Sequence, residues 1–340
     1  MNNHLYQKKL KINLCVGPMT INTIKSIDKF SKQNKKKIFI ICSRNQIENK
    51  ALGGGYVNNF STENFGKYIR KLKNSLLILG RDHGGPFTSD KKSNSLKKEI
   101  INCKKSFISD IKAGFELIHI DTSFAKNHKF KVALNLYNFC LKESQKYRKK
   151  IFYELGVNFH GDKFKKNEFN KIIKNFSTLK NVKFITGTTG SKINNSKQVG
   201  KFMEDNSKLM TKKLKSFDML IKDHNCDFLN KKQINLRKKC GIYSFNIGPE
   251  LASVENDILY AFGVKSKNKS FKIFLKQVLK SEKWKKWCNK SSSNRLKFSS
   301  SAHYLYNENS FLDFKKNFLD NTNFDSLVLR KHLNIYKKFY

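Results

Sequence analysis

The sequence predicts a closed (β/α)₈ barrel, or TIM barrel, with a helical extension at its C-terminal end. Short, nearly continuous apolar runs alternate with longer lysine-rich amphipathic stretches, a pattern typical of buried parallel strands separated by surface helices. There are eight such runs, and polar residues follow most of them. In a barrel, functional side chains collect at the carboxyl ends of many strands, whereas an open sheet gathers them at one switch point. The polar strand ends therefore favour the barrel.

The predicted strands and helices follow one another in strict alternation. We expect strands at residues 12–17, 37–43, 76–80, 117–121, 151–155, 182–187, 219–222 and 243–247. We expect helices at residues 21–33, 64–72, 95–113, 131–147, 168–176, 199–213 and 231–238. Each of these helices is amphipathic enough to pack one face on the barrel.

A single domain with one extension accounts for the length of 340 residues, because α/β barrels of this size are common. We expect the barrel to occupy residues 1–264. Residues 265–340 are basic and rich in aromatic side chains but carry few strand signals, so we expect helices packed on the barrel. Hydrophobic residues make up 39% of the chain, which is enough for a sizeable core.

The formal net charge of +43 raises the question of a polyanionic partner, because lysine and arginine gain from counterion release at phosphates. The lysines are spread along the whole chain, and no helix-turn-helix, zinc-finger or aromatic RNA-binding motif accompanies them. We therefore expect compositional bias and no specific nucleic-acid partner. A nonspecific polyanion-binding protein remains the alternative, and attraction for phosphorylated small molecules is compatible with the charge.

The cysteine pattern and the hydropathy predict a cytoplasmic protein without a membrane segment. The seven cysteines are scattered and never form a Cys-x-x-Cys pair, which is typical of reduced, buried thiols. The N-terminal eleven residues are polar, and no window approaches the ~18 consecutive apolar residues that a membrane helix needs.

Asp82 and His83 are the sharpest chemical signal in the sequence. They stand side by side at the end of the third predicted strand, followed by two glycines and a proline that bend the chain. A neutral imidazole there can ligate Zn²⁺, and a neighbouring carboxylate can shuttle a proton to a substrate hydroxyl. The structural alternative is a histidine that caps a helix and an aspartate that binds backbone amides.

Glu154 and His224 stand at the ends of two further predicted strands. If the barrel is correct, both project to the same mouth as His83, and two histidines with a glutamate form an ordinary catalytic zinc set. Taken singly, Glu154 could form a salt bridge with a lysine, and His224 could be a loop histidine. His119, inside an apolar strand, is expected to be a core residue, and His160 a loop residue.

Substrate and phosphate contacts are expected at the remaining strand ends. Glycine-bearing turns after the sixth and eighth strands can present backbone N–H groups to a phosphate, as barrels often do near their last strands. Such turns are common, so the signal is weak by itself. The candidate residues are Gly187, Gly190, Asn246 and Gly248, together with Asp121 and Ser123 at the end of the fourth strand.

In combination, these segments resemble the non-catalytic subunit of class II D-tagatose-1,6-bisphosphate aldolase, a relative of the class II zinc aldolases. Residues 79–86 run Leu-Gly-Arg-Asp-His-Gly-Gly-Pro, similar to Gly-Gly-Asp-His-Leu-Gly-Pro in that family. Residues 118–123 run Ile-His-Ile-Asp-Thr-Ser, similar to its Ile-His-Leu-Asp-x-Ser. Further matches lie at residues 43–48, 54–56, 224–227, 246–251 and 329–340.

The resemblance implies roles for four residues. Asp82 corresponds to the proton-transferring aspartate of the zinc aldolases, and His83, Glu154 and His224 correspond to metal-site residues. One zinc ligand is missing, because the catalytic enzymes carry His-Gly after the sixth strand where this chain has Gly-Thr-Thr-Gly at 187–190. Arg81 also replaces a glycine, and residues 157–161 depart from the family's loop.

Two functions follow from this resemblance. The leading hypothesis is that the chain is a subunit that stabilises or assists a catalytic aldolase. Such a subunit would act in carbohydrate metabolism and form an oligomer with its partner. The alternative is a stand-alone aldolase that cleaves a phosphorylated ketose with Asp82 as proton shuttle and Zn²⁺ on His83, Glu154 and His224. A kinase is not expected, because the chain lacks a Walker-type phosphate loop.

Overall fold

The computed structural model describes residues 12–157, 164–319 and 323–340, and it confirms the predicted (β/α)₈ barrel. Eight parallel strands close in the order β1-β10-β9-β6-β5-β4-β3-β2. His160 and most of the loop at 157–161 lie outside the described residues. The strands are β1 (Leu14–Val16), β2 (Ile38–Cys42), β3 (Leu77–Arg81), β4 (Leu117–Asp121), β5 (Phe152–Gly156), β6 (Val182–Thr186), β9 (Leu220–Asp223) and β10 (Ser244–Ile247).

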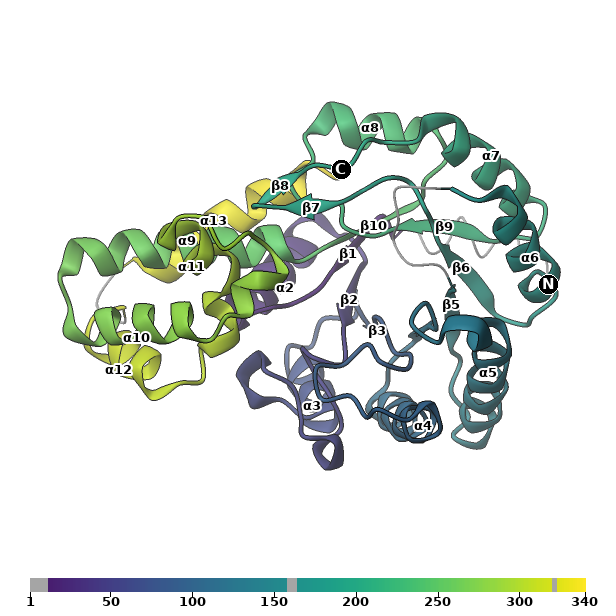
Figure 1. The fold of residues 1–340 in the computed structure, drawn as a ribbon, viewed down its shortest axis with the longest axis horizontal. Coiled ribbons are helices and arrows are strands. Elements are labelled where there is room, and N and C mark those ends of the chain that lie inside the picture. The colour runs from purple at the N-terminus through teal and green to yellow at the C-terminus, as the bar shows by residue number, and fades with distance from the viewer. Residues whose placement is uncertain (1–11, 158–163, 320–322) are drawn as a thin grey trace.

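The helices of the barrel pack around its outer surface (Figure 1). Apolar residues on the outward side of the strands and on the facing helix surfaces form one continuous core. Side-chain caps fix several helix starts: Ser61 precedes α3 and accepts the N–H of Asn64. The helices are α2 (Ile21–Asn34), α3 (Thr62–Lys71), α4 (Leu96–Ala113), α5 (Lys129–Lys146), α6 (Lys166–Phe176), α7 (Glu204–Lys215), α8 (Lys231–Lys239) and α9 (Pro249–Ser266).

The connection between β6 and α7 differs from the sequence prediction. A helix was expected from residue 199, but α7 begins at Glu204. The preceding residues form a short antiparallel hairpin of β7 (Ile193–Asn194) and β8 (Lys197–Gln198). The Gln198 side chain stabilises this hairpin, because its amide oxygen accepts the Lys192 N–H at 2.6 Å.

The C-terminal extension is helical, as predicted. It comprises α10 (Lys269–Lys280), α11 (Asn294–Ser301), α12 (Asn309–Asn317) and α13 (Phe324–Lys337). Phenylalanines of α10, α11 and α12 form a second core that includes Leu259 of α9, so α9 belongs to both parts. Figure 1 shows α10 and α12 together at one end of the molecule.

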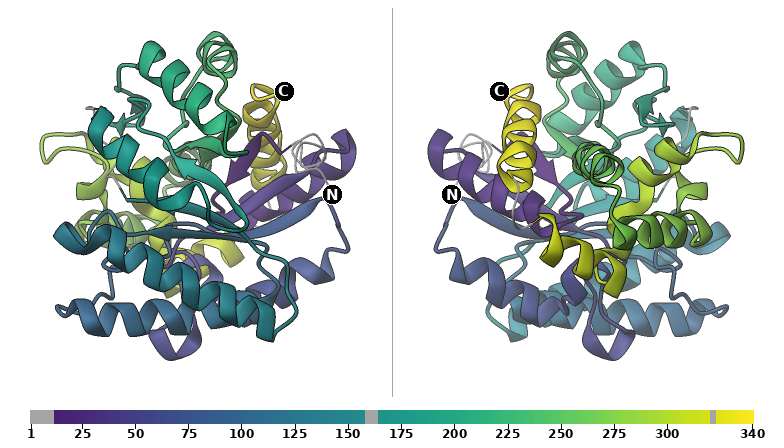
Figure 2. Two further views of the ribbon diagram at one scale, coloured as in Figure 1. Left: turned by 90° about the vertical axis from the view of Figure 1, so that its right-hand side faces the viewer. Right: turned by 90° about the vertical axis from the view of Figure 1, so that its left-hand side faces the viewer.

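The last helix, α13, returns to the barrel and lies beside α2 (Figure 2). Both Tyr336 and His332 of α13 contact the hydroxyl of Ser26 on α2, at 2.8 Å and 3.0 Å. These contacts tie the end of the chain to the barrel wall. No helix within the described ranges is long and apolar enough to cross a membrane.

Candidate active site at the barrel mouth

Every second residue of each strand points into the barrel. Several predicted site residues occupy these inward-facing positions, so their side chains come together. The lower interior is apolar and contains Phe39, Leu117, Phe152 and Phe184. Above these side chains, toward the carboxyl ends of the strands, the same faces carry polar residues. They are Asp82 after β3, His119 and Asp121 on β4, Glu154 on β5, Thr186 on β6, Lys222 on β9 and His224 after it.

Asp82 lies at the centre of three histidines. Its Oδ1 is 3.2 Å from His119 Nδ1 and 4.0 Å from His224 Nδ1, and its Oδ2 is 3.6 Å from His83 Nε2. The three ring centroids are 5.0–5.2 Å apart. Potential ligand atoms of these four residues all lie within 4.8 Å of one another. The prediction that Asp82, His83 and His224 share one mouth is thus confirmed.

Glu154 is fully buried beneath this group and is held by three partners. Lys222 Nζ lies 2.6 Å from its Oε2, and His224 Nε2 lies 2.7 Å from its Oε1. Thr186 also donates its hydroxyl proton to Oε1 at 3.1 Å. Both oxygens of the predicted metal ligand therefore have protein donors.

The charges within the cluster shift several pKa values. Burial alone would lower the pKa of His83, but Asp82 and Asp121 outweigh it and raise that pKa to about 9. Burial would raise the pKa of Asp82, but His83 and His224 hold it well below its usual range. For His224, burial prevails over the nearby carboxylates and lowers the pKa. These shifts favour a protonated His83 and a neutral His224.

Three of these inward-facing polar residues, His119, Thr186 and Lys222, were not selected as site residues from the sequence, and the first and last of them are the most informative. His119 was expected to be a core residue; it is fully buried, but its ring contacts Asp82. Lys222 was expected only as the last residue of the predicted strand at 219–222. A signal was available for both, since His119 is two residues before Asp121 and Lys222 is two residues before His224. Such spacing places both members of a pair on one face of a strand.

Asp121 and Ser123 form part of the support for His83. Asp121 Oδ2 accepts a hydrogen bond from His83 Nδ1 at 2.6 Å. The Asp121 Oδ1 atom accepts the backbone N–H of Ser123 at 3.0 Å and also the Ser123 hydroxyl. The carboxylate thereby orients the imidazole.

The side chain of Asn246 is a candidate for substrate contact. Asn246 is paired in register with Cys15, an interior residue, so its side chain faces the barrel interior. The side chain is buried, and neither its amide nitrogen nor its amide oxygen has a hydrogen-bond partner within the described structure. A buried amide without partners costs free energy, and a ligand that binds both atoms would relieve that cost.

The predicted phosphate-binding glycines have contacts within the chain. Gly248 N–H donates to Asp227 Oδ1 at 2.8 Å, as does the N–H of Glu250, so Asp227 caps the start of α9. Gly187 N–H donates to the carbonyl oxygen of Lys222 at 3.1 Å. Gly190 has a φ of +87° and leaves no room for a Cβ beside the Lys201 carbonyl. Phosphate binding by these residues stays a prediction.

Arg81, which departs from the resembled family, points away from the mouth. It is fully buried on the outer side of β3 and forms two hydrogen bonds with Asp110 of α4, at 2.9 Å and 2.6 Å. A further bond to the carbonyl oxygen of Ile47 is 2.6 Å long. This departure is therefore part of the packing between strand and helix.

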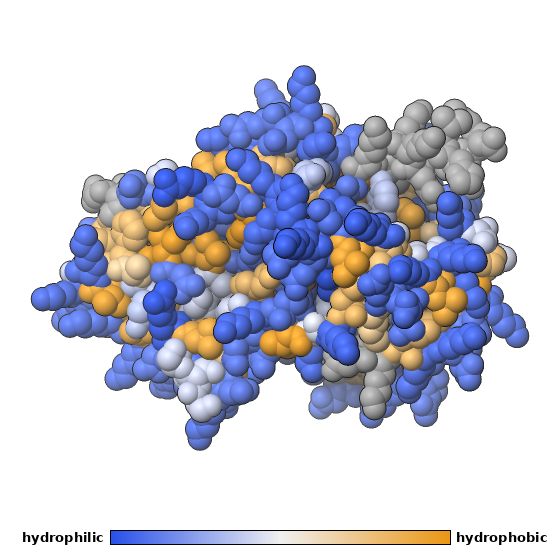
Figure 3. Space-filling view, turned by 90° about the horizontal axis from the view of Figure 1, so that it is seen from above, coloured by the Kyte–Doolittle hydropathy of each residue, from blue (hydrophilic) through white to orange (hydrophobic). Residues whose placement is uncertain are grey.

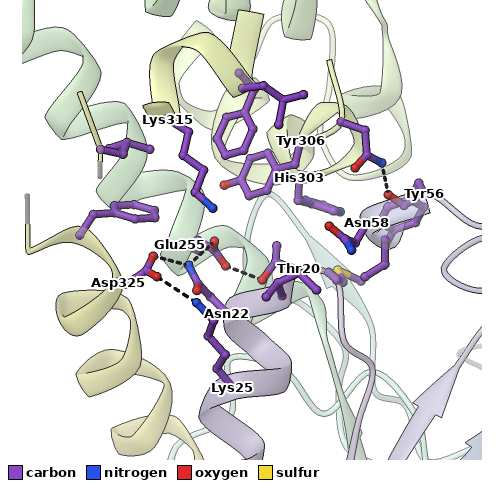
Figure 4. A pocket seen from close by; sticks show the side chains of 18 residues that line it. Thr20, Asn22, Lys25, Tyr56, Asn58, Glu255, His303, Tyr306, Lys315 and Asp325 are labelled. Carbon is purple, nitrogen blue, oxygen red and sulfur yellow. Dashed lines mark hydrogen bonds and ion pairs between the residues drawn. The ribbon is translucent and has the colours of Figure 1, made fainter. Parts of the chain in front are cut away.

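A separate cavity of about 120 Å³ lies between the barrel and the C-terminal helices (Figure 4). None of the predicted site residues lines it. Its wall includes Glu255 of α9, which accepts hydrogen bonds from Thr20 Oγ1 at 2.5 Å and Asn22 Nδ2 at 3.0 Å. Burial raises the pKa of Glu255 to about 7. Lys25 and Asp325 pair at 3.2 Å at its rim.

Solved structures resemble this chain over nearly its whole length. A probable tagatose 6 phosphate kinase from Sinorhizobium meliloti 1021 superposes with a TM-score of 0.75 at 14% identity, covering 96% of this chain and 98% of that one. A fructose-bisphosphate aldolase from Campylobacter jejuni gives 0.59 at 12% identity, covering 99% and 94%. The YdjI aldolase from Escherichia coli K12 gives 0.51 at 11% identity, covering 94% and 96%.

At these identities, the likeness establishes the fold and not the activity. No protein-family model and no curated protein matches the sequence.

Proposed function

We propose that this chain catalyses, with a bound divalent metal ion, the aldol cleavage or formation of a phosphorylated ketose. The observation that carries the proposal is the convergence of three histidines from three strands on the carboxylate of Asp82 at the barrel mouth. The fold likeness to the aldolases from Campylobacter jejuni and Escherichia coli supports the same class of reaction. Of the two functions that the sequence suggests, this geometry favours the catalytic one.

The residues at the mouth fit a divalent ion such as Zn²⁺. Imidazole nitrogens and a carboxylate are ordinary zinc ligands, and the candidate atoms lie within 4.8 Å of one another. The carboxylate of Asp82, whose pKa is held well below its usual range, adds a negative charge that favours a cation in this buried place. When bound, such an ion polarises the carbonyl group of the ketose.

The chain's own residues supply proton transfer and orientation. Asp82 is ionised and partly exposed, with 14% of its side chain accessible, so it can take the proton of the substrate hydroxyl as the adjacent carbon–carbon bond breaks. In the reverse direction it returns that proton. Asn246 can donate to one substrate oxygen and accept from a hydroxyl. The charge of the chain favours a phosphorylated substrate.

The second candidate is the subunit role, in which the chain stabilises a partner aldolase. Three observations favour it. The first is the motif resemblance, and the second is that residues Gly187 to Gly190 offer no histidine where the catalytic enzymes have one. The third is that Glu154 is engaged by Lys222.

The test is a coupled assay of triose phosphate release from ketose 1,6-bisphosphates by the zinc-loaded chain. Asp82→Asn should lower kcat by at least about 100-fold, while Asp90→Asn, an exposed aspartate in the same loop, should retain activity. A chain that is inactive alone but raises the activity or stability of a catalytic aldolase would support the subunit role. Neither activity nor an effect on an aldolase would refute both.

A further inference from the structure

The hydrogen bonds of the cluster assign a tautomer to His224. Its Nε2 lies 2.7 Å from Glu154 Oε1, and Glu154 is an ionised acceptor because Lys222 Nζ lies 2.6 Å from its other oxygen. Nε2 must therefore carry the proton. In the neutral ring, the lone pair is then on Nδ1, the atom that faces Asp82 at 4.0 Å.

His119 has the same arrangement through one intervening hydroxyl. The Thr186 hydroxyl donates to Glu154 Oε1, so its oxygen accepts a proton from His119 Nε2, which is 3.1 Å away. The lone pair of neutral His119 is then on Nδ1. The backbone N–H of His83 donates to this atom at 3.2 Å, which agrees with that assignment. Nδ1 also lies 3.2 Å from Asp82 Oδ1, so in this tautomer two acceptor atoms face each other, an arrangement that a cation bound to both would stabilise.

His83 completes the pattern with the opposite nitrogen. Its Nδ1 donates to Asp121 Oδ2 at 2.6 Å, so in the neutral ring the lone pair is on Nε2, which faces Asp82 Oδ2 at 3.6 Å. Each of the three rings thus has one nitrogen oriented by a carboxylate, directly or through Thr186, and the other turned toward Asp82. A carboxylate behind each imidazole is the usual support of a metal-ligating histidine.

Glu154 has the supporting position and not the ligand position in this arrangement. Both of its oxygens have donors, and one of these donors is the fully buried ammonium of Lys222. A metal ion at Glu154 would have to displace the ammonium of Lys222 or the ring of His224, whereas an ion at His119 Nδ1 displaces only the neutral backbone N–H of His83. Ligands bonded at about 2.0–2.2 Å lie about 3–4 Å from one another, so the candidate atoms, which lie within 4.8 Å of one another, would move closer together on binding an ion.

We propose that the metal ion is held by three histidines, through His83 Nε2, His119 Nδ1 and His224 Nδ1, and that Glu154 orients His119 and His224 without binding the ion. The third histidine comes from β4 in place of the one absent after β6. Lys222 keeps Glu154 in its supporting position, and Asp82 beside the ion stays available for proton transfer. The inference rests on the proposed function for the presence of a metal, but not on the identity of the substrate.

X-ray absorption of the zinc-loaded full-length protein tests the ligand set directly and needs no variant. We expect three imidazoles per zinc; two or fewer would overturn the inference. Zinc affinity, measured by competition with a chromophoric chelator, gives a second readout. Less than a tenth of an equivalent of bound Zn²⁺ in the wild-type chain would overturn it as well.

Variants separate ligands from supporting residues. His119→Ala should weaken zinc binding by at least about 100-fold, while the exposed His128→Ala should leave it unchanged. Glu154→Gln should cost about 10–100-fold, as loss of a supporting carboxylate does, and should keep three imidazoles on the zinc. Unaltered affinity in a folded His119→Ala protein, or loss of a zinc–oxygen neighbour in Glu154→Gln, would contradict the assignment.

The outcomes for the two proposals are distinct. A three-histidine zinc site in a chain without aldol activity would leave this inference standing and remove the catalytic function. Aldol activity with zinc bound by His83, Glu154 and His224 would support the catalytic function and overturn the three-histidine ligand set.

Discussion

Adjacent residues of this barrel have different roles because their side chains point to opposite sides of a strand. Arg81 faces outward and pairs with Asp110, whereas Asp82 faces the mouth. On β9, Asp223 faces outward and accepts the Thr189 hydroxyl at 2.5 Å, while Lys222 faces inward. A departure from the family pattern can therefore be assigned to the site or to packing only when the side of the strand that the residue faces is known. Arg81 faces the helices, so its role is structural.

Arg81→Met should destabilise the protein strongly. Both partners of the Arg81–Asp110 pair are fully buried, and removal of one partner leaves an uncompensated charge, which typically costs about 3–5 kcal/mol. Urea unfolding would measure the loss. Replacing both residues, as Arg81→Met with Asp110→Leu, should recover part of it, whereas zinc affinity at the mouth should be unaffected by either variant. A loss below about 1 kcal/mol would contradict the role assigned to the pair.

Glu255 should make the folded state less stable as the pH rises. Burial raises its pKa to about 7 from its ordinary value of 4.5, so between pH 4.5 and 7 the unfolded chain releases a proton that the folded chain keeps. The free energy of unfolding then falls across this window, by up to about 3 kcal/mol for a shift of this size. The contribution of protonated Glu255 to stability is fully present below pH 4.5, the pKa of this group in the unfolded chain.

Glu255→Gln should remove this dependence. Chemical denaturation at each pH would measure the free energy of unfolding of both proteins. As the pH rises from 5 to 7, the wild type should lose stability relative to the variant. Asp227, whose pKa burial also raises to about 7, is present in both proteins and cancels in the difference. A difference that is constant with pH would show that Glu255 is not the responsible group.

At the scale of strands and helices, the sequence predicted the features that follow from the local hydrophobic pattern. The eight strands could be located because runs buried on both faces are apolar throughout. The β7–β8 hairpin was missed because each of its strands is only two residues long. The pairing of Glu154 with Lys222 could not be predicted, because β5 and β9 are not neighbours in the barrel and their side chains meet only inside it.

The β3–α4 connection depends on Gly85 for close packing. The two glycines after His83 were expected to bend the chain, and one of them is also closely packed, because a Cβ on Gly85 would lie 1.4 Å from the Asp121 carbonyl oxygen. Gly85→Ala must therefore displace the end of β4 and the Asp121 side chain that orients His83. We expect a loss of at least about 2 kcal/mol in stability and weaker zinc binding.

Gly17→Ala is the matched control for this variant, because the nearest atom to its new Cβ is the end of the Gln46 side chain at 3.2 Å. Calorimetry and zinc titration of both variants would check the prediction. If Gly85→Ala were as stable as Gly17→Ala, the close approach of the two segments would not matter for the site.

At the scale of the whole molecule, two apolar cores meet along α9, and positive charge dominates the surface. Even if each of the 26 acidic residues paired with one of the 69 basic residues, 43 positive charges would remain. Figure 3 shows hydrophilic side chains over much of one face. Repulsion among such charges opposes the compact state, and salt reduces the repulsion by shortening the Debye length from about 30 Å at 0.01 M to about 10 Å at 0.1 M.

The thermal stability should therefore rise with ionic strength. We expect Tm to increase by about 3 °C or more between 10 and 100 mM NaCl, since about 1 kcal/mol corresponds to roughly 2–4 °C in domains of 150–250 residues. Choline chloride at equal ionic strength should have the same effect, because general screening does not depend on the cation. Inorganic phosphate should exceed both salts only if the chain also binds phosphate specifically. A Tm that stays constant or falls would mean that the excess charges are too far apart to destabilise the fold.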